Sequence, residues 1–150
     1  MKLMKITSAT AVLLSVGFLG NLSLADSEGI IKYRKNVKKT NAGHMGAIMD
    51  ILKNHLPLET HVVDHARSIN QNSKMILSMF PKGSDSGDTK AKTSIWKNWS
   101  KFETVSKAFV RESAKLVKVA ESGDMKAFAK QVRAIGKTCG GCHKHFKERE

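Results

Sequence analysis

Cysteine and proline are scarce in this 150-residue chain, which has two of each. Because Cys139 and Cys142 are three positions apart in one motif, no other thiol remains for a structural disulfide. Pro57 and Pro81 each coincide with a break in helical periodicity, since a proline inside a helix removes a hydrogen bond. The sequence also lacks a strand pattern and an internal repeat. We therefore expect a single all-helical domain without a disulfide framework.

Long apolar runs are absent as well. The longest follows two lysines near the N-terminus and ends at Leu19, but serine and threonine interrupt it, whereas a membrane span needs about 20 strongly apolar residues. Ala25 then ends a stretch with small residues where signal peptidase requires them. We predict that residues 1–25 are a secretory signal peptide, and that residues 26–150 form one periplasmic domain without a membrane span.

Acidic residues are few, with 13 acidic against 26 basic side chains and a formal charge of +13. Loss of Lys2 and Lys5 with the signal peptide lowers this charge to +11. A basic chain can bind nucleic acid, an anionic membrane or an acidic protein. Export argues against nucleic acid, and the lysines are spread along the chain instead of clustering with aromatic residues. An acidic protein partner and a simply well-solvated surface both remain open.

Apolar residues recur with helical spacing in four segments, at about residues 27–55, 59–79, 94–120 and from 125 onward. Residues 82–88 contain no apolar side chain and two glycines, which is typical of an exposed loop. Gly123 and Asp124 supply a helix stop and an N-cap. Four amphipathic helices with short connections predict an all-α fold, an antiparallel up-and-down four-helix bundle.

The motif Cys139-Gly140-Gly141-Cys142-His143 falls late in the fourth predicted helix. A spacing of three on a helix brings the two thiols onto one face, as the capture of both vinyl groups of one haem requires. In c-type haem attachment, the histidine that follows the second cysteine is an axial iron ligand. We predict one covalent haem c, attached through Cys139 and Cys142, with His143 as the proximal iron ligand.

Three other uses of this motif are less favoured. A thioredoxin-like dithiol belongs at a helix start in a βαβ context, which does not match a late position in an all-helical chain. A zinc site would need both cysteines, His143 and His145 to converge from different faces of one helix. A disulfide across three residues would leave His143 without a role.

Beyond the motif, the chain resembles the class II c-type cytochromes, meaning the cytochrome c-prime family with its low-spin, methionine-ligated relatives. The resemblance rests on Tyr33-Arg34-Lys35, on Gly43-His44-Met45-Gly46, on Ile95-Trp96 with Trp99 and Phe102, and on Gly136-Lys137-Thr138. It implies that Arg34 holds the haem propionates, that Lys35 is a neighbouring polar contact, and that a homodimer is possible. Where the family has an aromatic residue and an arginine after the haem histidine, this chain has Phe146-Lys147.

The distal side of the iron departs from the resemblance. Five residues after the tyrosine, low-spin members carry a methionine ligand and high-spin members an apolar residue, whereas this chain has Lys38. Lys38 shares the sevenfold register of Ile31 and Met45, so the periodicity itself directs it inward. It could ligate iron as a neutral amine, pair with a propionate, or face solvent. Met45 is the alternative distal ligand, but it lies two turns, about 10 Å, along the helix from Lys38, so both cannot face one iron.

We expect the chain to be a one-electron carrier that serves redox partner proteins, and not an enzyme, because the sequence shows no catalytic constellation. The alternative is a five-coordinate haem protein that binds nitric oxide or carbon monoxide as a carrier, scavenger or sensor. A peroxidase would need a distal histidine or arginine, which we do not identify. His61 and His65, four apart on one predicted helix, indicate an exposed pair and not a metal site, because no further ligand accompanies them.

Overall fold

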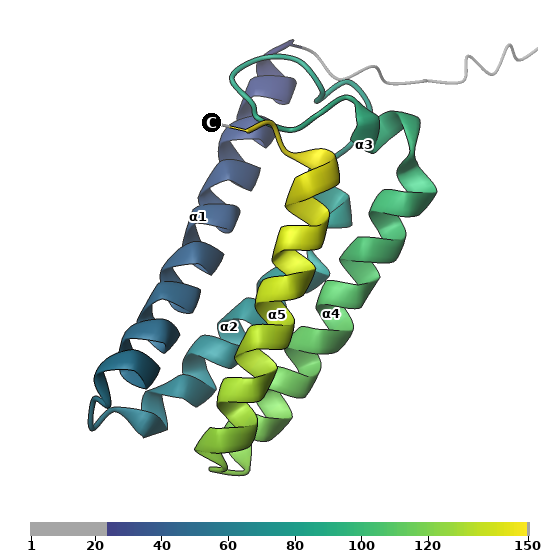
Figure 1. The fold of residues 1–150 in the computed structure, drawn as a ribbon. Coiled ribbons are helices and arrows are strands. Elements are labelled where there is room, and N and C mark those ends of the chain that lie inside the picture. Colours follow the sequence, from purple (N-terminus) through teal and green to yellow (C-terminus); the bar gives the residue numbers. More distant parts are fainter. Residues whose placement is uncertain (1–23, 150) are drawn as a thin grey trace, which may run out of the picture.

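The computed structural model describes residues 24–149, and four long helices dominate this part of the chain (Figure 1). They run alternately up and down, which confirms the predicted all-α four-helix bundle. Residues 1–23 of the predicted signal peptide lie outside the described part. None of the helices in residues 24–149 combines the length and the apolarity that crossing a membrane requires. The long helices are α1 (Leu24–Asn54), α2 (Val62–Lys74), α4 (Trp99–Glu121) and α5 (Met125–Phe146).

Two of the predicted helices are shorter than the apolar spacing suggests. The second predicted segment divides into a 3-10 turn η1 (Glu59–His61), α2, and a second 3-10 turn η2 (Leu77–Met79). The third divides at Asn98, whose φ of −125° and ψ of 50° separate the short helix α3 (Ser94–Lys97) from α4. A break of one residue barely disturbs a sevenfold apolar repeat, so periodicity alone does not reveal it. Trp99 is 38% exposed just after this break.

The interior consists of two apolar clusters, one toward each end of the bundle. The first cluster joins α1, α2, α4 and α5 through Ile48, Ile51, Val62, Ala66, Ile69, Leu116, Ala120, Phe128, Val132 and Ile135. The second lies near the 81–92 loop and consists of Ile76, Met79, Phe80, Ile95, Phe102 and Phe146. Phe109 packs against both clusters, so α4 links the two ends of the interior.

Helix α4 holds the bundle together, because it packs closely against both α2 and α5, while α1 packs against α2. Within the described residues, α1 and α5 are not among the closely packed helix pairs. The bundle is therefore least tightly closed on the side where α1 and α5 face each other.

The predicted N-cap of the last helix is confirmed. The Asp124 carboxylate accepts a hydrogen bond of 2.9 Å from the backbone N–H of Ala127. Gly123, with a φ of 72°, provides the left-handed residue that reverses the chain before it. This cap fixes where α5 starts.

We expect Asp124→Ala to lower the free energy of unfolding by about 1 kcal/mol, because it removes the acceptor for a helix N-terminal N–H. Asp124→Asn is the matched control, because its side-chain oxygen can still cap the helix. Chemical denaturation of the haem-loaded protein measures both. Equal stability of the wild type and Asp124→Ala would contradict the assignment of this cap.

Candidate functional site

Helix α5 places Cys139 and Cys142 on one face, as the sequence predicts. Both side chains are partly buried, and no disulfide joins them. Cys139 packs against the first apolar cluster and Cys142 against the second, so the pair marks the boundary between the two. Burial raises the pKa of both thiols, and the nearby positive charge of Lys38 opposes the shift. The thiols therefore occupy an apolar setting with one cation close by.

His143 follows Cys142 on α5 and remains exposed. It lines an open surface pocket of about 500 Å³ together with Gly140, Lys144 and Lys147. Partial burial lowers the pKa of His143, and the charges of Lys38 and Lys147 lower it further. This environment favours the neutral imidazole, which is the form that binds a metal ion.

Lys38 reaches the same region from α1. Its side chain is exposed along part of its length, and its Nζ lies 5.5 Å from the centroid of the Phe80 ring, where the surrounding protein desolvates the ammonium. This desolvation lowers the pKa of Lys38; the two cysteines oppose the shift, and Arg34 and Lys147 add to it.

The thiols and Lys38 face each other across the side of the bundle where α1 and α5 do not pack closely. A flat group attached to α5 could therefore enter there without displacing a tight helix contact. The two thiols lie on one face of α5, so both could bond to the same edge of such a flat group. His143 supplies a neutral ring nitrogen beside them. These residues fit a covalently bound haem.

Arg34 is the most deeply buried charged side chain of the site, at 2% exposure. It donates hydrogen bonds from Nη1 to the Ser84 hydroxyl at 3.0 Å and from Nη2 to the Thr89 hydroxyl at 2.7 Å. Its guanidinium also lies over the rings of Phe80 and Trp96, at 4.8 and 5.7 Å from their centroids. Arg34 therefore ties the 81–92 loop to α1.

Lys35 and Met45 lie apart from the two thiols and Lys38. Lys35 Nζ is 2.5 Å from the carboxylate of Asp88, and both side chains are at least half exposed. Met45 is partly buried against the first apolar cluster. Lys38, by contrast, lies over a ring of the second cluster. The structure thus brings Lys38 to the thiols, and it gives Met45 a packing role.

Several contacts of the site escape sequence reasoning. Ser84 and Thr89 belong to a segment that reads only as a polar loop, yet their hydroxyls hold Arg34. The Trp96 indole donates a hydrogen bond of 2.9 Å to the carbonyl of Pro81, which fixes the start of this loop. Lys92 donates its backbone N–H to the carbonyl of Phe146 at 3.1 Å, so the loop also reaches the end of α5. No sequence signal connects these distant positions.

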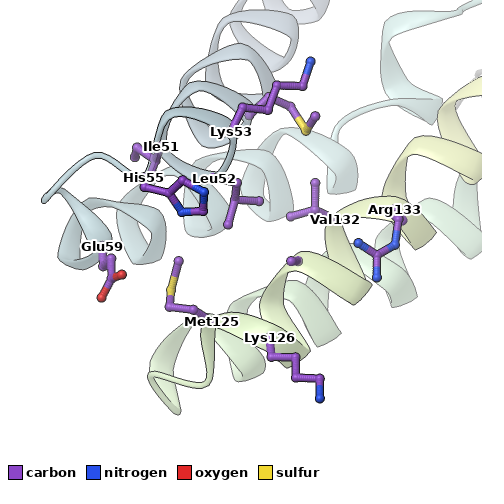
Figure 2. A pocket seen from close by; sticks show the side chains of 11 residues that line it. Ile51, Leu52, Lys53, His55, Glu59, Met125, Lys126, Val132 and Arg133 are labelled. Carbon is purple, nitrogen blue, oxygen red and sulfur yellow. The ribbon is translucent and has the colours of Figure 1, made fainter.

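A second pocket of about 510 Å³ lies at the opposite end of the α1 and α5 pair (Figure 2). Leu52, Met125 and Val132 contribute to its apolar lining. The side chains of Lys53 and Lys126 point to opposite sides of it and do not converge on one point (Figure 2). None of the predicted site residues lines this pocket. It is therefore separate from the thiols.

The comparisons with known proteins agree with this arrangement. A family model described as Cytochrome C' matches residues 29–147. The chain is 34% identical to cytochrome c' of Rhodospirillum rubrum, covering 98% of this chain and 99% of that protein. It is 28% identical to cytochrome c-556 of Agrobacterium tumefaciens over 79% of this chain and 97% of the relative. The structure of cytochrome c prime from Shewanella frigidimarina superposes with a TM-score of 0.77 at 30% identity, covering 82% of this chain and 97% of that one.

The two thiols, the imidazole of His143 and the arrangement of the helices match those of a c-type haem protein. The chain belongs to the cytochrome c' family. Its cofactor is one covalent haem c.

We expect Arg34→Ala to lower the free energy of unfolding by about 3 kcal/mol, because it leaves two hydroxyls without a donor and removes a buried side chain from two aromatic rings. Lys35→Ala, one residue away, should change stability little, because its ion pair is exposed. Denaturation of the haem-loaded variants measures both effects. Similar losses for the two variants would show that Arg34 does not anchor the loop.

Proposed function

We propose that this protein is an exported one-electron carrier in which Cys139 and Cys142 bind the haem covalently and His143 ligates its iron. The observation that carries the proposal is the placement of two partly buried cysteines on one face of α5, directly before a histidine whose surroundings favour the neutral ring. When bound, the haem supplies an iron that can alternate between the ferric and ferrous states. The chain attaches it, orients it and partly shields it from water.

The surface around His143 supports transfer to an acidic partner. The pocket that contains His143 is lined by Lys144, Lys147 and Arg149, with Glu148 as the acidic residue. Positive charge near an exposed edge of the site would attract an acidic redox protein and orient it there. The net charge of the whole chain, +13, has the same sign.

A carrier fits these residues better than an enzyme. Arg34 is engaged by two hydroxyls and two aromatic rings. His44 and His65 pair with each other between α1 and α2. These engagements support a site that holds a redox group without supplying an acid or base for bond cleavage.

Gas binding is the second candidate, and the position of Met45 favours it. Met45 packs into the first cluster, whereas Lys38 lies over a ring of the second, so Met45 is not placed beside Lys38. A distal position without a methionine would allow a small ligand such as nitric oxide or carbon monoxide to bind. A structure of a nitric oxide complex is known for a variant of cytochrome c prime from Alcaligenes xylosoxidans, which shares this fold with a TM-score of 0.76.

We expect Cys139→Ala and Cys142→Ala together to abolish covalent haem, while the wild type keeps its haem after denaturation. Two thioether bonds to the protein survive unfolding, whereas ligation alone does not. Haem-stained denaturing gels and intact-protein mass measure the outcome. Loss of haem from the denatured wild type would contradict the proposal, and retention in the double variant would assign attachment elsewhere.

We expect Lys38→Ala to change the ferric absorption spectrum and Met45→Ala to leave it unchanged, because Lys38 alone of the two lies beside the thiols. A low-spin wild type that becomes high-spin in Lys38→Ala would identify the lysine as the sixth ligand and support electron transfer. A high-spin wild type that readily takes up carbon monoxide would favour gas binding. The reverse pattern, with Met45→Ala changing the spectrum and Lys38→Ala silent, would contradict this description of the distal side.

A further inference from the structure

A pair of histidines joins α1 to α2, apart from the cysteine motif. His44 of α1 and His65 of α2 approach so closely that their Nδ1 atoms are 3.0 Å apart. Both side chains are partly buried, and their rings are tilted by 52° with centroids 5.2 Å apart. We propose that His44 and His65 form a binding site for a divalent transition metal ion such as Cu²⁺ or Zn²⁺, with water completing the coordination.

The separation of the two nitrogens suits a shared metal ion. With metal–nitrogen bonds of about 2.0 to 2.1 Å, two ligands of one ion lie about 2.9 Å apart at a right angle and about 3.3 Å apart in a tetrahedron. The observed 3.0 Å falls within this interval. To bind one ion, each ring must turn so that its lone pair points away from the line between the two nitrogens and toward the ion. Imidazole nitrogen is moreover a preferred ligand of Zn²⁺, Cu²⁺ and Ni²⁺.

The protonation of the pair also suits metal binding. The two facing nitrogens can share one proton, since one ring donates and the other accepts, but two protons would place donors against each other. Burial lowers the pKa of His65, and the neighbouring His44 and His61 lower it further, whereas Asp64 opposes the shift. A metal ion would replace the shared proton and satisfy both nitrogens at once.

The proposed metal site has only two protein ligands, which decides how firmly it can hold an ion. Within residues 24–149, no set of three or more histidine, cysteine, aspartate or glutamate side chains is arranged to hold a metal ion. The site therefore differs from a closed structural zinc site, which has four protein ligands. We expect an exchangeable ion that links α1 to α2 and stabilises the folded bundle according to its concentration.

Zn²⁺ is the probe for the test, because it has no redox chemistry with a haem. Calorimetric titration of the haem-loaded protein should show one bound ion and a rise in Tm on adding Zn²⁺. His44→Gln and His65→Gln should each weaken binding by about tenfold or more and abolish the rise in Tm. His61→Gln, four residues from His65, and His55→Gln are the matched controls and should keep wild-type affinity.

Each other outcome would overturn the proposal. Absence of Zn²⁺ binding by the wild type would show that the pair is only a hydrogen bond between helices. Loss of binding in His61→Gln with retention in His44→Gln would assign the ion to His61 and His65 instead. Should either glutamine variant fail to fold, the wild type alone still decides: electron paramagnetic resonance of added Cu²⁺ should show two imidazole nitrogens, and fewer than two would refute the site.

Discussion

A flat macrocycle joined to one helix at two points requires neighbouring helices that do not close over those points. Here α5 carries both thiols, and α1, the helix that faces them through Lys38, is held by α2 instead of by α5. Helix α4 makes this arrangement stable, because it packs against α2 on one side and α5 on the other. The bundle thus keeps two compact apolar clusters, and Cys139 and Cys142 lie where the two meet.

Charge near the thiols is unusual for a region this apolar. Arg34 and Lys38 project from consecutive turns of α1 and share the Phe80 ring, but they differ in their partners. Arg34 finds two hydroxyls and becomes part of the framework. Lys38 lies over the Phe80 ring, and the protein around it lowers its pKa.

Much of the fold followed from local patterns, and most of the site contacts did not. The apolar repeats, Gly123 with Asp124, and the spacing of Cys139 to His143 are local signals, and each predicted a feature that the structure contains. The break at Asn98 was missed because the helix resumes in nearly the same register. The pairing of His44 with His65 was also missed, because the sequence links His65 to His61 on one helix, whereas the contact depends on how α1 and α2 cross.

The central claim, that α5 alone carries the covalent haem, can be tested on the wild-type protein by peptide mapping. Trypsin cuts after Lys137 and Lys144, which isolates residues 138–144 with both cysteines. This peptide should carry the mass of one haem, and its cysteines should resist alkylation after reduction. Recovery of the same peptide without haem and with two alkylated cysteines would contradict the account.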